Sequence, residues 1–251
     1  MKIIQVTPEN VQKETLYCVK DITSPAFDSK RKWFEKRYAE GVRMKILKDD
    51  EDNMLGFIEY VPVEQAWRPI EGHNLMFIHC IMVHSKKDRE KGNGSILINE
   101  VERESLEAKM DGICAMVSKG AWMADKTVFE KNGFIPVDHK GRFDLLFKKL
   151  NPSAKNPELL DWTVTQKEYQ GWHLLYADQC PWHQKSVTDL LNTAMDFDID
   201  LKIHEIKTAQ EAKNAPSGYG TFGLLHDGKL VSDHYISATR FRNILKKAMV
   251  K

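Results

Sequence analysis

The chain has 251 residues and a formal net charge of +1, which gives no electrostatic reason to expect nucleic acid as its main partner. Its length allows one large domain or two small ones, and its 42% hydrophobic content is ordinary for a globular protein. No apolar run is long enough to predict a membrane span, and the first ten residues lack the apolar region of a secretory signal.

The first 150 residues show the patterns of alternating strands and helices. Thr7 followed by Pro8 predicts a helix start, and Gly41 and Gly133 predict helix ends. We expect strands at 2–6, 43–48, 53–60, 75–83 and 112–117, helices from residue 8 and at 28–41, 95–110 and 124–134, and two final strands. This mixed order predicts an α/β or α+β sheet with helices packed on it.

Residues 151–157, NPSAKNP, are the best candidate for a domain boundary because two prolines stand among small and polar residues. We therefore predict a first domain at 1–150, a linker at 151–160 and a second domain at 161–251. In the second domain we expect strands at 171–177 and 201–206, helices at 180–197 and 237–249, and a hairpin at 219–236 turned at Asp227-Gly228.

A loop with the pattern R-x-x-G-x-G, formed by Arg89, Gly92 and Gly94, follows the apolar strand predicted at 75–83. Glycines at the start of a helix let main-chain N–H groups approach an anion closely. The loop lacks the G-K-[ST] of a Walker motif and the third glycine of a dinucleotide fingerprint. A plain strand-to-helix turn remains the alternative.

The strand end IMV, the loop REKGNG, the strand ICAMVS and the segment DKTVFEKNGF together resemble the GNAT superfamily of acyl-CoA-dependent N-acetyltransferases. The resemblance implies a mixed central sheet, acetyl-CoA as co-substrate, and acetyl transfer to a primary amine of a small molecule or peptide. It implies that the backbone of Ile81, Met82 and Val83 pairs with the pantetheine arm. It also implies that the segment from Arg89 to Ser95 holds the pyrophosphate group. The candidate binding residues in this segment are Arg89, Lys91, Gly92, Asn93, Gly94 and Ser95.

In this superfamily the amine attacks the thioester directly, so no covalent acyl-enzyme is expected. Glu59 and His79, on the central strands, are candidate bases, with a solvent-facing glutamate and a buried structural histidine as the alternatives. Phe129 stands where the superfamily usually has a tyrosine that protonates the leaving thiolate, and Trp122 stands at the place of its common asparagine.

Four cysteines without a C-x-x-C pair indicate a reducing cytoplasm and predict neither disulfides nor a metal site. Cys80 and Cys114 are expected to be core thiols. Trp33, Trp67 and Glu64 could receive a cationic amine, although an aromatic core and a solvated charge are the favoured interpretation.

The segment CPWH, Cys180 to His183, places a thiol at a predicted helix start, where the dipole should lower the pKa of Cys180. The segment and the element order resemble the thioredoxin-like fold, glutaredoxins especially. His183 replaces the second cysteine, and Gly220 falls where that fold has a cis-proline. A single-thiol chemistry with His183 as base, and a module for interaction or substrate gating, both remain open.

The two domains together resemble the bacterial YoaP type of GNAT protein. The leading hypothesis is a cytoplasmic acetyl-CoA-dependent N-acetyltransferase without nucleic-acid or membrane partners. The alternatives are an acyl-CoA-binding sensor without catalysis and a redox protein that uses Cys180. The acceptor and the oligomeric state are not predicted.

Overall fold

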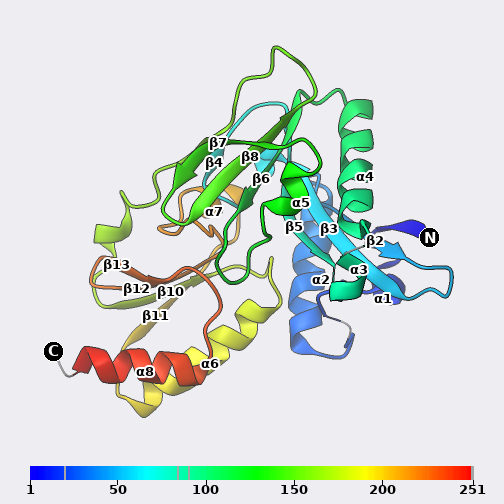
Figure 1. Ribbon diagram of the computed structural model, residues 1–251. Helices are drawn as coiled ribbons and strands as arrows, with labels where there is room; N and C mark the ends of the chain where they lie inside the picture. Colours follow the sequence, from blue (N-terminus) through cyan, green and yellow to red (C-terminus); the bar gives the residue numbers. More distant parts are fainter. Residues whose placement is uncertain (20, 84, 90, 250–251) are drawn as a thin grey trace. The chain divides into compact units, whose positions relative to one another are not determined.

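The computed structural model describes residues 1–19, 21–83, 85–89 and 91–249, and these form two compact units (Figure 1). The first unit consists of Met1–Ile22, Phe34–Ala66 and Ile70–Leu160. The second consists of Thr23–Trp33, Trp67–Pro69 and Asp161–Lys251. Two short segments from the first half of the chain therefore belong to the second unit, a division that no motif in the sequence indicates.

A seven-stranded sheet forms the centre of the first unit, in the order β1-β2-β3-β5-β6-β8-β7. Only β5 and β6 run parallel, and every other neighbouring pair is antiparallel. The strands are β1 (Lys2–Val6), β2 (Arg43–Lys48), β3 (Met54–Pro62), β5 (Leu75–Val83), β6 (Gly112–Val117), β7 (Ile135–Lys140) and β8 (Phe143–Lys149). A separate pair joins β4 (Ile70–Glu71) to β9 (Glu158–Leu159).

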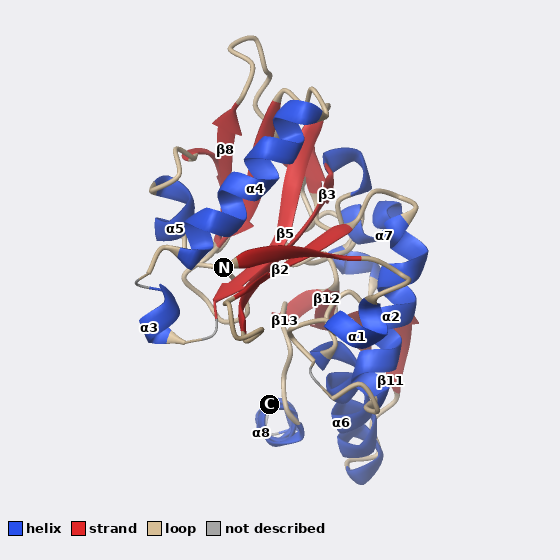
Figure 2. Ribbon diagram, turned by 90° about the vertical axis from the view of Figure 1, so that its right-hand side faces the viewer, coloured by secondary structure: helices blue, strands red, loops and turns tan. Residues whose placement is uncertain are grey.

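Helix α4 (Asn93–Glu107) lies along the sheet and packs on its central strands (Figure 2). Its apolar side chains recur at helical spacing, and Leu97, Ile98 and Val101 are fully buried against Ile58 and Ile78. This burial fixes the position of the first turn of α4. The other helical segments are α1 (Val11–Glu14), α2 (Pro25–Tyr38), α3 (Lys86–Arg89), α5 (Thr127–Glu130) and the 3₁₀ turn Val63–Gln65.

Strands β5 and β6 separate halfway along their length. Their pairing ends at Ile78 and Ala115, although β5 continues to Val83. The register of β5 against β3 shifts at the same place, where His79 and Cys80 together oppose Glu59. An extra residue of this kind is a β-bulge, which bends its strand and redirects side chains. The bulge therefore marks the point at which β5 leaves β6.

The second unit contains a four-stranded sheet in the order β11-β10-β12-β13, in which only β10 and β11 run parallel. Asp227 and Gly228 turn the β12–β13 hairpin with φ of 46° and 72°, as their sequence predicts. The elements are β10 (Trp172–Tyr176), α6 (Trp182–Asp196), β11 (Leu201–Glu205), α7 (Ala209–Lys213), β12 (Phe222–His226), β13 (Lys229–Ser232), α8 (Ala238–Met249) and the 3₁₀ turn Gln166–Glu168.

The predicted fold class is confirmed, because a mixed sheet carries packed helices. Three helix predictions differ clearly in extent: α1 begins at Val11 rather than at Pro8, α2 spans Pro25–Tyr38 rather than 28–41, and α5 is a single turn rather than a helix over 124–134. Helix α7 and the β4–β9 pair were not predicted. The thioredoxin-like topology and the limits 1–150, 151–160 and 161–251 remain predictions. Within the described residues, no helix is long and apolar enough to cross a membrane.

Candidate active site

A cavity of about 630 Å³ opens where β5 ends and α4 begins. One wall is the end of β5, the second is the glycine loop with the first turn of α4, and the third is the segment around α5. The lining residues are Ile81, Met82, Val83, Arg89, Gly92, Gly94, Ser95, Met123, Ala124, Asp125, Thr127, Val128 and Lys131. Seven of the nine residues predicted to bind the cofactor are among them.

The glycine loop presents free main-chain donors at the cavity. The amides of Arg89, Lys91 and Gly92 are already bonded to carbonyls of the preceding turn. Within the described part of the chain, the amides of Asn93, Gly94 and Ser95 have no acceptor. These are the first three residues of a 15-residue helix, where unpaired N–H groups and the positive dipole end attract anions. Of the residues predicted to hold the pyrophosphate through their main chain, only 93–95 keep free amides. Glu90 lies outside the described residues.

Glycine is required at two positions of this loop for different reasons. Gly92 has φ of +79°, and a Cβ built on it would meet no atom within 4 Å. Its missing side chain therefore leaves space on the cavity side of the loop. Gly94 lies so close to α5 that a Cβ would stand 2.9 Å from Cγ2 of Val128. The first glycine keeps the cavity open, and the second brings its two walls together.

The end of β5 offers the cavity an unpaired strand edge. Ile81, Met82 and Val83 pair with β3 on one side, whereas the ladder to β6 has ended at Ile78. A strand edge with free N–H and C=O groups can accept an extended ligand as an added strand. The geometry is therefore suited to the main-chain pairing that the sequence resemblance implies for these three residues.

The third wall was missed as a binding element, although the sequence resemblance includes it. Asp125 accepts hydrogen bonds from the N–H and hydroxyl of Thr127, and these bonds lower the pKa of Asp125. This D-x-T turn starts α5 and was the available signal for the wall. Lys131, at the end of the turn, lines the cavity as a second cation in addition to Arg89.

Two residues predicted to hold the pyrophosphate, Lys91 and Asn93, do not line the cavity. Lys91 is exposed, and its Nζ lies 3.3 Å from Oδ1 of Asp88. Asn93 is fully buried, and neither end of its amide has a partner among the described residues. Its side chain follows the sheet-facing stripe of α4, so only its main chain can bind the pyrophosphate.

Glu59 and His79, the two candidate bases, form a buried pair at the β-bulge. Nδ1 of His79 lies 3.4 Å from Oε1 of Glu59, and their side chains are 0% and 1% exposed. Neither Glu59 nor His79 is among the described residues that line the cavity. The structure places the two side chains in contact, which the sequence did not indicate, and their role as bases remains a prediction.

The position of the expected tyrosine belongs to the core. Phe129 is 1% exposed and packs edge-on against Phe134 at 5.3 Å. It cannot supply a proton to a leaving group. The two cysteine predictions divide: Cys114 is buried, and burial raises its pKa, whereas Cys80 is exposed. The core prediction for Cys80 was wrong because it follows the bulge, where β5 has lost its neighbour.

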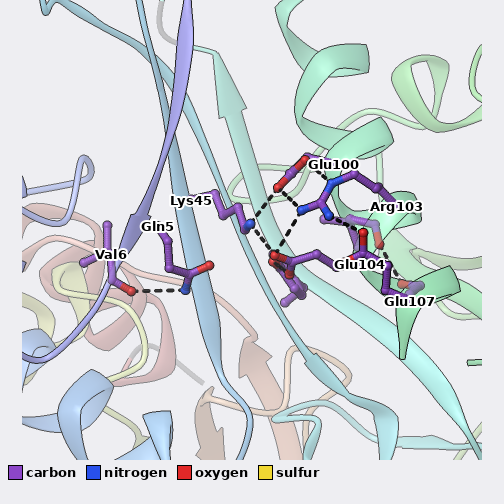
Figure 3. A network of polar contacts seen from close by, with 10 residues as sticks. Gln5, Val6, Lys45, Glu100, Arg103, Glu104 and Glu107 are labelled. Atoms are coloured by element: carbon purple, nitrogen blue, oxygen red, sulfur yellow. Dashed lines mark hydrogen bonds and ion pairs between the residues drawn. The ribbon is translucent and has the colours of Figure 1, made fainter. Parts of the chain in front are cut away.

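Charged groups hold the middle of α4 on the sheet (Figure 3). Nζ of the buried Lys45 lies 2.7 Å from Oε1 of Glu100 and also binds Glu104, which accepts a hydrogen bond from the Tyr60 hydroxyl. Hydrogen bonds from Arg103 lower the pKa of Glu100 to about 2, and Lys45 adds to this shift. Burial and then Glu104 raise the pKa of Tyr60. The network ties the middle of α4 to strands β2 and β3.

In the second unit, Cys180 is half-buried just before α6, as the sequence predicts. His183 is 1% exposed, and its Nδ1–H donates to the carbonyl of Ala177 at 2.8 Å. Burial lowers the pKa of His183 to about 3. A histidine held neutral in this way is a poor proton acceptor near neutral pH, so the geometry does not support the predicted base role.

Trp33 and Trp67, considered for an acceptor amine, are both buried in the second unit, with ring centres 5.2 Å apart. The favoured core interpretation is therefore correct for this pair. Glu64 instead accepts a hydrogen bond from the N–H of Asn74 at 2.8 Å. Throughout the described ranges, no group of three or more potential ligands is arranged to hold a metal ion.

Comparison of the sequence with known proteins gives two similarities. Residues 200–243 match a family model described as YoaP-like. The chain is also 26% identical to the N-acetyltransferase YoaP of Bacillus subtilis (strain 168), a protein described as uncharacterized, and the alignment covers 98% of both chains.

Solved structures also resemble the chain, at greater distance. A ribosomal-protein-alanine N-acetyltransferase from Brucella melitensis is 21% identical with a TM-score of 0.43, covering 60% of this chain and 100% of that one. A spermidine N-acetyltransferase SpeG variant from Vibrio cholerae is 15% identical with a TM-score of 0.43, covering 59% and 92%. The sequence similarities, which are the stronger ones, confirm the predicted resemblance of this chain to the bacterial YoaP type.

Proposed function

We propose that the protein is an acyl-CoA-dependent N-acetyltransferase that carries an acetyl group from acetyl-CoA to a primary amine of a small molecule or peptide in the cytoplasm. The observation that carries this proposal is the cavity between the unpaired end of β5 and the free amides of α4. The similarity to YoaP, an N-acetyltransferase by name, over almost the whole chain supports the same activity.

The cavity fits the anionic half of coenzyme A. The free amides of Gly94 and Ser95, which line the cavity, are donors for phosphate oxygens, and the cations Arg89 and Lys131 stand on two different walls. The open space beside Gly92 lets a phosphate approach the main chain, which a larger side chain would prevent. The fit thus depends on backbone and charge.

The cavity also fits the extended half. Ile81, Met82 and Val83 leave one edge of β5 unpaired, so an amide-bearing arm can bond to it in the manner of a strand. An arm bound in this way runs toward the bulge at His79. The acetyl thioester would then lie near the point where β5 and β6 separate.

The thioester supplies the activated acetyl group, and the chain supplies position and a proton acceptor. An amine reaches the site as an ammonium ion, so a proton must be removed before it can attack. We propose that the Glu59–His79 pair accepts this proton. Nδ1 of His79 and Oε1 of Glu59 are 3.4 Å apart and lie next to the point where β5 and β6 separate. A thiolate is a fair leaving group, so a core phenylalanine at position 129 is compatible with transfer.

Binding is tested by thermal unfolding with and without acetyl-CoA. A saturating ligand should raise the Tm by several degrees, and Gly92→Trp should abolish the shift because it fills the cavity. Gly171→Trp is the matched control: Gly171 has φ of +80°, Gly92 has +79°, and a Cβ meets no atom within 4 Å at either place. A shift that persists in Gly92→Trp would place the ligand elsewhere.

Catalysis is tested separately, by release of free coenzyme A in the presence of small primary amines and peptide amines. Transfer requires release above the rate of hydrolysis and an acceptor heavier by one acetyl group. Binding without acceptor-dependent release from any amine would favour the sensor alternative, for which the core position of Phe129 is the supporting observation.

A further inference from the structure

Arg68 carries a buried guanidinium that the second unit holds at one nitrogen and on one face. The residue is 2% exposed, and its Nη1–H groups donate to the carbonyl of Trp67 at 2.8 Å and to Oγ1 of Thr221 at 3.3 Å. The guanidinium carbon lies 4.5 Å from the ring centre of Tyr219. These contacts fix the position and the plane of the guanidinium.

The main chain at Arg68 is held just as closely. A Cβ built on Gly220 would stand 2.7 Å from the carbonyl oxygen of Trp67 and 2.9 Å from Cα of Arg68, so glycine is what lets the two segments touch. The N–H of Thr221 donates to the carbonyl of Tyr219 at 2.8 Å, which closes the turn that carries both contact residues. The chain therefore holds Arg68 in place without help from a ligand.

The opposite edge of the guanidinium has no partner among the described residues. Nε and Nη2 of Arg68 make no hydrogen bond, and no carboxylate pairs with either of them. Neither nitrogen is among the side-chain atoms that are both sealed from solvent and unpaired. The small accessible part of Arg68 therefore includes this edge, and a ligand atom can approach it there.

The shape of this edge selects a particular kind of anion. Nε–H and Nη2–H point in parallel from one side of a guanidinium, and the two oxygens of a carboxylate accept both hydrogen bonds at once. A guanidinium that is buried without an anion carries a charge that is costly to desolvate. The unpaired edge of Arg68 thus has both the geometry and the energetic reason to take a carboxylate.

The neighbouring charges favour an anion as well. Lys30, a second buried cation of this unit, is 1% exposed, and its charge and that of Arg68 both act on the neutral His183. The acid of the same region is Asp178, which accepts a hydrogen bond from Gln184 at 2.7 Å. Since Asp178 is not paired with Arg68 in the described structure, it leaves the edge available.

We propose that the second unit contains a binding site for the carboxylate of a small organic acid, formed by Nε and Nη2 of Arg68. Thr221 and Tyr219 hold the guanidinium in advance, so little ordering is left for binding to achieve. Binding is noncovalent and requires no thiol in the ligand or in the chain. The site is also separate from acetyl transfer, because every residue that forms it belongs to the second unit.

The first test observes the edge directly in the intact chain. The Nε–H resonance of Arg68 is assigned by its loss in Arg68→Met, or in Arg68→Lys if the first variant does not fold. It is then followed by NMR near pH 7, where acetate and succinate are ionised. Either acid should move the resonance in a saturable manner, whereas the matched amides, acetamide and succinamide, should not. A resonance that neither acid moves would overturn the proposal.

The second test separates the shape of the edge from its charge. Arg68→Lys keeps the positive charge and loses the parallel donors, so it should weaken succinate binding by about tenfold or more. Arg242→Met is the matched control: it removes a half-buried guanidinium that pairs with Asp196, and it should leave binding within about twofold of the wild type. The measurement is the succinate concentration that gives half of the maximal increase in Tm, at constant ionic strength. Equal values for Arg68→Lys and the wild type would exclude a site built on the paired donors.

Inorganic phosphate tests the class of anion. Phosphate sites usually gather several N–H groups, whereas this site offers a single planar edge, so succinate should bind more tightly than phosphate. Tighter binding of phosphate would overturn the assignment to a carboxylate. Acetyl-CoA should still raise the Tm of Arg68→Lys as it does that of the wild type, so a failure of this site and a failure of the acetyl-CoA site give different results.

Discussion

In the first unit the candidate cavity is lined by main-chain groups, apolar side chains and the two cations Arg89 and Lys131, whereas in the second unit the charges of two buried cations act on His183. The first cavity is held open by Gly92 and lined by the unpaired edge of β5. In the second unit Arg68 and Lys30 are 2% and 1% exposed, and their charges add to burial in lowering the pKa of His183. The first site depends on the space that glycine leaves, and the second depends on buried cations.

The difference determines which substitutions each site tolerates. A site made from backbone loses function when a side chain fills it, and charges outside the cavity should affect it less than the cations that line it. A site made from buried charges is sensitive to every charge, because each acts over several ångströms in a medium of low polarity. The comparison is tested by changing a buried carboxyl group in the first unit and a main-chain position in the second.

Glu59 is the sharpest exception, because it is a buried ionisable side chain in the first unit. If the Glu59–His79 pair accepts the proton of the amine, Glu59→Gln should lower kcat by about 100-fold or more, with little change in the Tm shift caused by acetyl-CoA. The substitution keeps the size of the side chain and removes its charge. Steady-state kinetics with the best amine provide the measurement.

A glutamate of the same unit serves as the control. Glu71 on β4 is exposed, so Glu71→Gln should leave kcat within about twofold of the wild type. Equal activity in Glu59→Gln and the wild type would show that the buried pair is structural and that the base lies elsewhere.

Gly220 tests the opposite case, a position in the second unit where main-chain conformation and close packing, rather than charge, should matter. Its φ is +72°, and a Cβ would stand 2.7 Å from the carbonyl oxygen of Trp67 and 2.9 Å from Cα of Arg68. Gly220→Ala should therefore lower the free energy of unfolding by about 2–4 kcal/mol, through backbone strain and displacement of the Trp67–Pro69 segment. Denaturant unfolding measures the loss.

Gly171→Ala separates strain from collision. Gly171 has φ of +80° with no atom within 4 Å of a built Cβ, so alanine there should cost only about 1 kcal/mol. Similar losses at both positions would mean that the Trp67–Pro69 segment yields easily. In that case the binding of succinate should also be unaffected in Gly220→Ala.

The same contrast explains how much the sequence could predict. Strands and turns with local signals were found: β5 lies at Leu75–Val83 as predicted, and the second hairpin turns at Asp227 and Gly228. The glycine loop could be assigned to a cavity because close backbone approach requires glycine at fixed spacing. A backbone-built site therefore leaves a readable local pattern.

Features that depend on distant residues could not be predicted. Arg68 reaches the second unit from a loop between β3 and β4, more than a hundred residues before Thr221, and no pattern near either residue indicates their contact. The bulge at His79 arises from pairing with β3, so the exposure of Cys80 was not visible in an apolar run. Tertiary pairing decided both outcomes.

Glu100 gives the smallest expected effect and tests whether charge far from the cavity matters to it. Its carboxylate has a pKa of about 2, below the usual value of 4.5, because of Arg103 and then Lys45. The stabilisation is therefore complete above about pH 4.5 and is lost as the pH falls toward 2. Because the site is partly exposed, Glu100→Gln should cost only about 1 kcal/mol or less at neutral pH, measured by denaturant unfolding.

Two further measurements give this small effect its meaning. The difference in the free energy of unfolding between Glu100→Gln and the wild type should shrink from pH 7 to pH 3, since below about pH 4.5 the carboxyl takes up a proton in the unfolded chain while it stays largely ionised in the folded one. The Tm shift caused by acetyl-CoA should be equal in both proteins, because the free amides of the first turn of α4 do not depend on Glu100. A smaller shift in Glu100→Gln would show that the charge network in the middle of α4 sets the position of its first turn, and the cavity of the first unit would then depend on charges outside it as well as on its own lining.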